Sequence, residues 1–340
     1  MEFLKKIFNN ELNEKGHIEI AGYTFQRDEV LNTMDNEAYK QAFIDWKNER
    51  KINLIAKADE ILTPYNNLNK FKALQNKFKQ SKTILFIGAG MSMPSRYSGW
   101  TSFLYQLRED TRISKEELDS LINNGEYEKA AQILLNDMPQ NSFDEAISNE
   151  YHLDNDIIGA IQYLPYIFST SVITTNFDNV LKRCYDDSNK PFSEVILGAD
   201  TEELARLISS EDKLLVKLHG KANSSIQRIL TEDEYNQHYE DSSILKKSIE
   251  TICSNSLLFL GCSLSTDRTI KTMIEIVTEQ GGSSVPHYAF IGLNDESERL
   301  DRRDELAKAN IHPIWYDAND DHDECIEALL LKLADGVVEL

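Results

Sequence analysis

The sequence predicts an α/β protein built on a doubly wound, parallel, Rossmann-like sheet. Six short runs after residue 82 are apolar on both of their alternating faces, which is typical of parallel strands buried between two layers of helices. Stretches with helical periodicity separate these runs, and the alternation of strand and helix indicates a doubly wound sheet. The expected strands are TILFI (83–87), SVITT (171–175), LLVKL (214–218), SLLFL (256–260), YAFIGL (288–293) and HPIWY (312–316).

The chain between the first two expected strands is far too long for a single crossover connection. We therefore expect an inserted helical subdomain at about 113–168. Ser114 and Glu117 have the spacing of a capping box and predict that one of its helices begins there. The helices expected after residue 82 are 100–111, 114–123, 126–137, 154–168, 177–186, 201–209, 241–254, 266–280, 295–309 and 321–335.

Residues 1–82 differ from the rest of the chain in charge. They carry 14 basic and 12 acidic side chains, whereas the other 258 residues carry 22 and 45, so the net charges are +2 and −23. This contrast predicts an N-terminal extension over 1–82 and a second domain over 83–340. The extension is expected to form a hairpin at HIEIAGYTF, followed by helices at 31–62 and 66–82.

An isolated two-stranded hairpin is marginally stable, so the extension must pack on something. We expect it to contribute to a subunit contact, which makes the protein a homo-oligomer, or to the docking of a partner protein. The alternative is that it covers one edge of the sheet in its own chain.

Composition excludes several classes of protein. The net charge of −21 argues against broad capture of nucleic acid or of an anionic membrane, and the lysines of 66–82 are expected to form a solvated helix face. No apolar run is long enough for a transmembrane helix, and the N-terminus lacks the apolar stretch of a signal peptide. The four cysteines form no CxxC pair, so we expect neither a zinc ribbon nor disulfides, and a cytoplasmic location.

Glycines and polar residues follow four of the expected strands. Ligands of open parallel sheets bind outside the carboxyl ends of the strands, so these residues are expected to converge on one crevice. The segments are Gly88-Ala89-Gly90-Met91-Ser92, Asn176-Phe177-Asp178, His219-Gly220 and Gly261-Cys262-Ser263.

Each segment has a functional and a purely structural interpretation. The glycine turn at 88–90 allows close approach of a pyrophosphate, helped by the N-terminus of a following helix, or it is only a tight turn. His219 is a candidate general base, or a structural histidine. Asn176 and Asp178 are candidate ligand contacts, or only the cap and first-turn partner of the helix 177–186. Likewise, the turn at 261–263 contacts a ligand or caps the helix 266–280.

Together the motifs GAGMS (88–92), TTNFD (174–178), HG (219–220) and GCS (261–263) resemble those of the sirtuin superfamily, over about 83–320. The resemblance implies that NAD is bound at this crevice. Gly88, Ala89, Gly90 and Ser92 would hold its pyrophosphate, and Gly261 and Ser263 would face the adenosine ribose. Asn176 would contact the nicotinamide ribose or the attacking water, Asp178 the nicotinamide amide, and His219 would be the base.

The chain departs from the protein deacetylases of that superfamily at three places. The four-cysteine zinc module that follows the HG dipeptide is absent, since 221–255 hold only Cys253. ILTEDEY (229–235) stands in place of the peptide-binding segment, and PSRYSGWTSF (94–103) replaces the usual continuation of the glycine loop. The chain thus looks like the bacterial sirtuin-like branch of anti-phage defence, whose members hydrolyse NAD and some of which work with a HerA-type ATPase.

This resemblance predicts an NAD glycohydrolase in which water replaces nicotinamide, His219 assists and Asn176 orients the nucleophile. No zinc is expected, and NAD is the substrate. Two other functions stay open: a module that senses NAD or ADP-ribose without turning it over and regulates a partner ATPase or nuclease, and an NAD-dependent deacylase.

Overall fold

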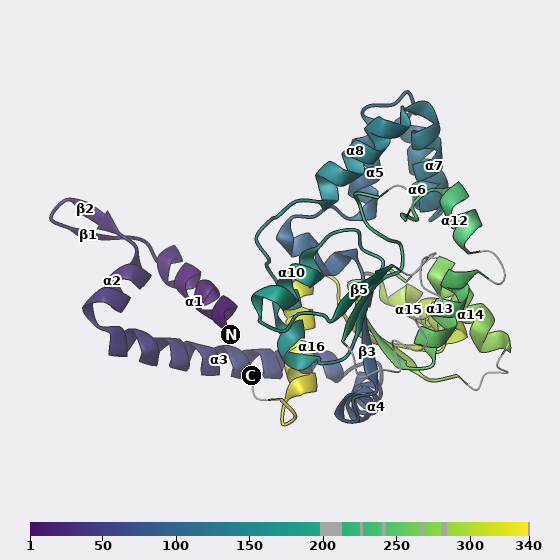
Figure 1. Ribbon diagram of the computed structural model, residues 1–340. Helices are drawn as coiled ribbons and strands as arrows, with labels where there is room; N and C mark the ends of the chain where they lie inside the picture. Colours follow the sequence, from purple (N-terminus) through teal and green to yellow (C-terminus); the bar gives the residue numbers. More distant parts are fainter. Residues whose placement is uncertain (198–212, 225–226, 240–242, 265–267, 280–283, 339–340) are drawn as a thin grey trace.

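The centre of the protein is a parallel sheet with the strand order β5-β6-β4-β3-β7-β8-β9 (Figure 1). The computed structural model describes residues 1–197, 213–224, 227–239, 243–264, 268–279 and 284–338. The expected doubly wound α/β class is confirmed. The strands are β3 (Thr83–Ile87), β4 (Val172–Thr174), β5 (Glu194–Leu197), β6 (Leu214–Lys217), β7 (Ser256–Leu260), β8 (His287–Leu293) and β9 (Ile311–Asp317).

The chain enters the sheet at its middle strand. From β3 it moves to β4 and on to β5 and β6, and it then returns to pair β7 against the other side of β3. The connections that leave β3 and β7 therefore run in opposite directions. Such a reversal opens a crevice at the carboxyl ends of the two strands, which is where ligands of this class of sheet bind.

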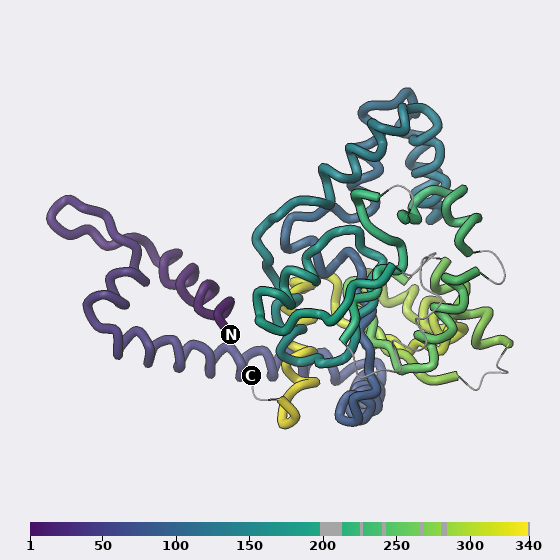
Figure 2. The backbone as a smooth tube through the Cα atoms, viewed as in Figure 1, coloured from purple at the N-terminus to yellow at the C-terminus, as the bar shows by residue number. Residues whose placement is uncertain are grey.

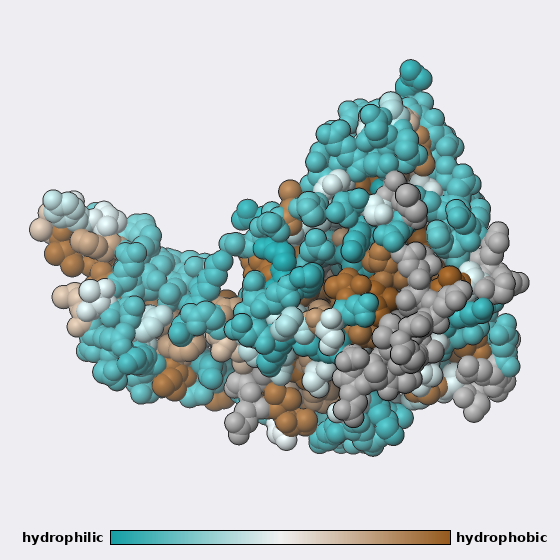
Figure 3. Space-filling view, in the orientation of Figure 1, coloured by the Kyte–Doolittle hydropathy of each residue, from teal (hydrophilic) through white to brown (hydrophobic). Residues whose placement is uncertain are grey.

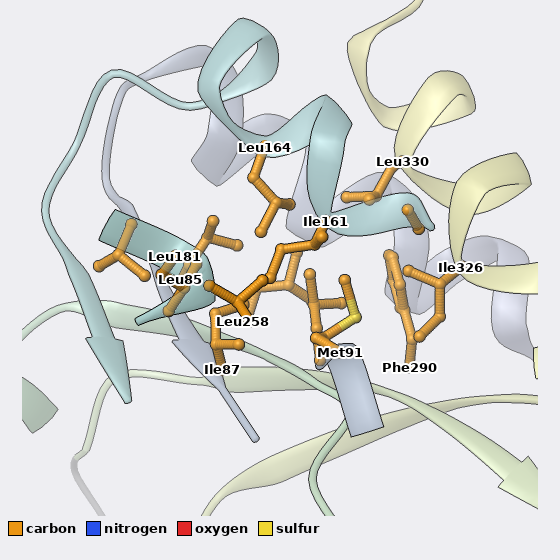
Figure 4. Packing of buried hydrophobic residues seen from close by; sticks show 14 of the residues in the cluster. Leu85, Ile87, Met91, Ile161, Leu164, Leu181, Leu258, Phe290, Ile326 and Leu330 are labelled. Carbon is orange, nitrogen blue, oxygen red and sulfur yellow. The ribbon is translucent and has the colours of Figure 1, made fainter. Parts of the chain in front are cut away.

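Both faces of the sheet are covered, as the doubly apolar strands predict. Leu85 and Ile87 pack into one hydrophobic cluster (Figure 4). Ile84 and Phe86 pack into another. The first cluster includes residues of α3 (Asn36–Leu62), α4 (Asn67–Lys79), α10 and α16, and the second includes residues of α13, α14 and α15. These helices, besides α3 and α4, are α10 (Val180–Asp187), α13 (Ile244–Cys253), α14 (Arg268–Glu279), α15 (Arg299–Lys308) and α16 (His322–Ala334), with η4 (Glu296–Glu298) before α15. The helix expected at 201–209 lies outside the described residues.

The expected helical insertion stands between β3 and β4 and projects from the body (Figure 1). Ser114 accepts a hydrogen bond of 3.1 Å from the backbone N–H of Glu117 and so caps α6 as expected. The expected helix 154–168 is instead two short turns, and α8 was not expected. The elements are α5 (Trp100–Arg108), α6 (Lys115–Asn123), α7 (Tyr127–Asp137), α8 (Gln140–Tyr151), η3 (Ala160–Tyr163) and α9 (Leu164–Ile167).

The N-terminal segment contains the expected hairpin, preceded by a helix that the sequence pattern did not predict. The helix expected at 31–62 is broken at Asp35, whose side chain caps the second half by accepting a hydrogen bond of 3.0 Å from Ala38. The elements are α1 (Glu2–Glu14), β1 (Ile18–Ile20), β2 (Tyr23–Phe25), α2 (Arg27–Met34), α3 (Asn36–Leu62) and α4 (Asn67–Lys79).

The change of charge at residue 82 does not coincide with a change in packing. The C-terminal half of α3 and all of α4 pack against the body, where Leu54, Leu62 and Leu74 belong to the main hydrophobic cluster. Arg50 forms a 2.7 Å ion pair with the buried carboxylate of Glu327 in α16. The positive charge of the segment comes largely from the lysines of α4. Lys72 and Lys79 are exposed, whereas Lys70 donates to the carbonyl of Pro313 in β9 at 2.7 Å.

Residues 15–45, here called the arm, project away from the body (Figures 1 and 2). The arm holds the hairpin, α2 and the start of α3. Its outer surface is apolar around the hairpin (Figure 3). The exposed apolar side chains of the arm are Ile20, Tyr23, Phe25, Met34 and Ile44.

Candidate active site

The floor of the crevice is formed by two glycine turns in contact. The backbone N–H of Gly88 donates to the carbonyl of Leu260, and that of Gly90 donates to the carbonyl of Gly261, both at 2.9 Å. A Cβ on Gly88 would lie 2.4 Å from the Gly261 oxygen, a distance that no side chain tolerates. The turn at 88–90 is therefore glycine-rich because a second backbone lies directly against it.

The element after this turn differs from the expectation. Two short 3₁₀ turns, η1 (Ala89–Met91) and η2 (Met93–Ser95), follow β3 in place of an α-helix. The residues Arg268 to Lys271 at the start of α14 do line the cavity. Helix-dipole stabilisation of an anion is thus available from α14 on the far side of the crevice and not from the glycine turn.

Asn176 is tied to the glycine turn. Its side-chain amide donates to the carbonyl of Gly88 at 3.1 Å and to the hydroxyl of Ser92 at 3.2 Å. Its side-chain oxygen is buried and has no hydrogen-bond partner among the described residues. The N-cap of α10 is Asn179, so the interpretation of Asn176 as the helix cap is wrong.

Asp178 is buried beside the start of α10. One carboxylate oxygen accepts a hydrogen bond of 2.9 Å from the backbone N–H of Val180. The structural part of its interpretation, a partner for the first turn of the helix, is therefore confirmed. The role in contacting a ligand stays a prediction.

Lys217, at the end of β6, is a component of the site that the sequence pattern did not reveal. It is only 2% exposed, and its ammonium group donates to the carbonyls of Phe177 and Asp178 at 2.9 and 2.7 Å. Burial lowers the pKa of Lys217 to about 8, against the opposing effect of the Asp178 charge. Lys217 thus holds the loop that carries Asn176. The sequence feature that could have revealed Lys217 is the presence of a lysine within an otherwise apolar, buried strand.

His219 lies just beyond β6 and is 2% exposed. Its Nε2 lies 2.8 Å from the hydroxyl of Tyr239, and its Nδ1 lies 3.4 Å from that of Tyr235. The next residue, Gly220, has a φ of +82°, and a Cβ there would lie 1.6 Å from the carbonyl oxygen of Gln227. The HG dipeptide therefore turns the chain sharply and leaves the imidazole at the crevice.

These segments surround a cavity of about 570 Å³, within the range of small-molecule and cofactor sites. The expected site residues that line it are Gly88, Ala89, Gly90, His219, Gly261 and Ser263. Three others, Ser92, Asn176 and Asp178, are buried, and Asn176 supports the glycine turn from behind. The site therefore contains two groups of residues. The lining faces the cavity, and the support, which includes Ser92, Asn176 and Asp178, is buried behind it.

The helical insertion supplies a wall of the cavity that was not predicted. Residues 124–129, Trp100 and Leu104 line it. Glu128 of α7 lies 2.6 Å from the Nε of Arg268, an ion pair that joins the insertion to α14 across the cavity. Lys129, Arg268 and Lys271 bring positive charge to the lining, in a chain that is acidic as a whole.

Within the described ranges, no three or more His, Cys, Asp or Glu side chains are grouped as a metal site would require. No described helix is long and apolar enough to cross a membrane. The cysteines Cys184, Cys253, Cys262 and Cys325 are all free thiols.

The fold and this site define the class of protein. A family profile described as a SIR2-like domain matches residues 170–314, a range that includes Asn176, His219 and Gly261. Residues 170–314 are thus similar to SIR2-like domains, and the resemblance to the sirtuin-like proteins of bacterial defence is confirmed.

The similarity extends to named bacterial proteins. The chain is 23% identical to the NAD(+) hydrolase ThsA of Cytobacillus dafuensis over 74% of this chain and 53% of that protein. It is 26% identical to Defense-associated sirtuin 2 of Bacillus subtilis over 58% of this chain and 20% of that protein. It is 20% identical to ThsA of Enterococcus faecium over 65% of this chain and 45% of that protein. The chain spans about half or less of the length of these relatives.

Proposed function

We propose that the protein is an NAD glycohydrolase that converts NAD and water to nicotinamide and ADP-ribose. The observation that carries the proposal is the meeting of three strand-end segments at one cavity, with His219 in its wall and with the fourth segment tied to the glycine turn through Asn176. The names of the ThsA relatives support NAD as the substrate.

The proposed reaction needs orientation more than strong acid catalysis. The bond between the ribose C1′ and the nicotinamide nitrogen breaks, and its electron pair neutralises the pyridinium charge of the leaving nicotinamide. An oxocarbenium-like centre remains, as in other glycoside hydrolyses. Water attacks C1′, and His219 accepts the proton as general base.

The other site residues have supporting roles in this proposal. The backbone of the glycine turn at 88–90 lies against the pyrophosphate in this proposal, and Gly261 and Ser263 face the adenosine ribose. Asn176 has a buried side-chain oxygen without a partner among the described residues, and that oxygen is available to orient the water or the nicotinamide ribose. Asp178 would contact the nicotinamide amide.

The test is the release of nicotinamide from NAD by the purified full-length chain. His219→Ala is expected to lower the rate by ~10²–10⁴-fold, the usual contribution of general-base catalysis. The exposed His152 provides a matched control, and His152→Ala should keep wild-type turnover. A His219→Ala variant with more than a tenth of wild-type activity would contradict the assignment.

The same assay separates the competing functions. Binding of NAD without nicotinamide release, alone and with a candidate partner ATPase, would instead indicate a sensing module. Release of nicotinamide that depends on an acylated peptide would indicate a deacylase.

We further propose that the protein acts in the cytoplasm as an anti-phage effector that depletes NAD. The relatives named as a defence-associated sirtuin and as NAD hydrolases support this role. A HerA-type ATPase is the proposed regulatory partner. Plating efficiency of phage on cells that express the wild type or His219→Ala, with and without the ATPase, tests both statements.

The arm is the proposed contact between copies of the chain. Within the part of the chain that the structure describes, its hairpin pairs with no third strand, and Tyr23 and Met34 are 71% and 76% exposed. Exposed apolar patches of this kind are typical of interaction sites. We commit to a second copy as the occupant because the hairpin can bury its open side by pairing with its equivalent around a two-fold axis.

Deletion of residues 1–80 is not a usable test, because it would remove Leu54, Leu62 and Leu74 from the core. Substitution of Tyr23 and Phe25 by Ser changes only the arm. The mass of the particle by light scattering is expected to fall, whereas Leu300→Ser, at an exposed site on α15, should leave it unchanged. An unchanged mass would overturn the contact, and loss of ATPase binding alone would indicate partner docking.

A further inference from the structure

His219 lies between two tyrosines of one helix. Tyr235 and Tyr239 are four positions apart, which is about one helical turn, and their rings stack with centroids 5.4 Å apart. Tyr235 lies in α12 (Glu232–His238), and Tyr239 is the C-cap residue of that helix. Each hydroxyl approaches a different nitrogen of the imidazole, at 2.8 Å from Nε2 for Tyr239 and at 3.4 Å from Nδ1 for Tyr235.

The hydroxyl of Tyr239 also joins His219 to a third element. It lies 2.9 Å from the hydroxyl of Thr269, a residue of the first turn of α14 that is 1% exposed. His219, Tyr239 and Thr269 thus form a continuous chain of hydrogen bonds from the end of β6 to the start of α14. His219, Tyr235 and Thr269 line the cavity.

The helix that carries the tyrosines is itself held firmly. Thr231 and Glu234 form a complete capping box at its start. The guanidinium of Arg268 lies over the ring of Tyr235, 5.4 Å from its centroid, and Arg268 is paired with Glu128. The two hydroxyls are therefore placed by the fold and do not depend on a ligand for their position.

We propose that Tyr239 is a positioning residue for His219, and this proposal rests on the proposed NAD hydrolysis. Nε2–H donates to the Tyr239 oxygen, and the Tyr239 hydroxyl donates to Thr269. This order leaves Nδ1 without a proton, so that it accepts the hydrogen bond of the Tyr235 hydroxyl. When a substrate occupies the cavity, the same nitrogen can exchange this contact for one to water or to a ribose hydroxyl and accept a proton from it. The imidazolium formed in that step keeps its Nε2–H on the Tyr239 oxygen as a charge-assisted hydrogen bond.

Tyr239→Phe tests the proposal because it removes one hydroxyl and keeps the stacked ring. Loss of a hydrogen bond to a charged group is expected to lower kcat by about 10- to 100-fold. The acid limb of the kcat/KM profile reports protonation of His219 in the free enzyme. If the bond to Tyr239 stabilises the protonated imidazole, its loss moves this limb to lower pH; if the bond destabilises it, the limb moves to higher pH. The proposal requires the shift to lower pH. Affinity for ADP-ribose should stay within twofold.

Matched variants separate positioning from structure. Thr269→Val is expected to produce a smaller loss of kcat in the same direction, and Tyr23→Phe, on the exposed hairpin, should have no effect. A Tyr239→Phe enzyme with wild-type kcat and pH profile overturns the proposal. A lower melting temperature with an unchanged pH profile also overturns it.

A second readout does not depend on turnover. Histidine labelled with ¹⁵N reports the tautomer of His219 by NMR, with its signals assigned by their loss in His219→Ala. At pH 8.5 the wild type should show the Nε2–H tautomer, and Tyr239→Phe should show a mixture. An Nδ1–H tautomer in the wild type overturns the proposal even if no NAD is hydrolysed, whereas the Nε2–H tautomer without turnover contradicts only the proposed function.

Discussion

The side-chain amide of Asn176 donates a hydrogen bond of 3.2 Å to the hydroxyl of Ser92. The two residues follow different strands, β4 and β3, and both are buried. A second contact, from the same amide to the carbonyl of Gly88, makes Asn176 the link between the loop after β4 and the glycine turn. A change at Asn176 therefore reaches the floor of the cavity directly.

Asn176→Ala is expected to abolish most NAD turnover. It should lower the stability of the fold only by the contribution of the two hydrogen bonds that are lost. The free energy of unfolding should fall by about 1–3 kcal/mol. Nicotinamide release and urea denaturation measure the two effects.

A true helix cap provides the comparison for this variant. Asp321 accepts a hydrogen bond of 2.8 Å from Glu324 at the start of α16. Asp321→Ala should lower stability by about 1 kcal/mol while turnover is retained. If Asn176→Ala behaves in the same way as Asp321→Ala, the role of Asn176 in the site is refuted.

Lys217→Met should reduce turnover by about tenfold or more, since the carbonyls of Phe177 and Asp178 lose a charge-assisted donor and the loop that carries Asn176 moves. Steady-state kinetics measure the effect, which is expected in kcat. Lys213, which is partly buried, donates to the carbonyl of Lys190 and lies outside this loop. It supplies the control variant Lys213→Met. Equal kinetics of the two variants would show that Lys217 only fills space.

Stability should fall on acidification because His287 is buried as the neutral imidazole. Its Nδ1 accepts a hydrogen bond of 3.2 Å from the backbone N–H of Leu257, and burial lowers the pKa of His287 from 6.5 to about 4. Between these two values the unfolded chain binds a proton that the folded chain does not, so the free energy of unfolding rises with pH in this window. From pH 7 to pH 5 the loss due to His287 is about 2 kcal/mol.

The variant His287→Gln isolates this effect, because Gln can accept the same hydrogen bond and does not titrate. Burial raises the pKa of Asp323 to about 6, which changes stability in the opposite direction, so the wild type and His287→Gln must be compared at each pH by urea denaturation. Parallel curves for the two proteins between pH 7 and pH 5 would disprove the role of His287.

Chelation should have no effect on the protein. EDTA is expected to leave both the melting temperature and NAD turnover unchanged, since no metal-binding group of side chains is found in the part of the chain that the structure describes. Elemental analysis of protein purified from zinc-supplemented cells provides the check. One zinc per chain would contradict this prediction and revive the deacylase as a function.

The sheet and the strand-end segments were predictable because buried parallel strands and glycine turns have strong local patterns. β5 was missed because it is a short edge strand that begins with the exposed Glu194. The helix α8 was missed although its buried residues Phe143, Ile147 and Tyr151 recur every four positions, since polar residues fill the intervals.

The support of the site was harder to predict than its lining. Lys217 reads as an outward-facing charge in a strand, and only the layers on both faces of the sheet make it internal. The contact of Tyr239 with His219 and Thr269 depends on the placement of α12 and α14 relative to one another, and no local sequence pattern encodes that placement.

The contact between the two glycine turns also has a consequence for biosynthesis. The hydrogen bonds of Gly88 and Gly90 need Leu260 and Gly261 as partners, and the neighbouring contact of Phe86 with Cys262 joins residues 176 positions apart in the chain. A nascent chain has no complete cavity floor until β7 has left the ribosome and paired with β3. Under the proposed function, this order of events means that the chain cannot hydrolyse NAD until the residues up to Gly261 have been synthesised and have folded.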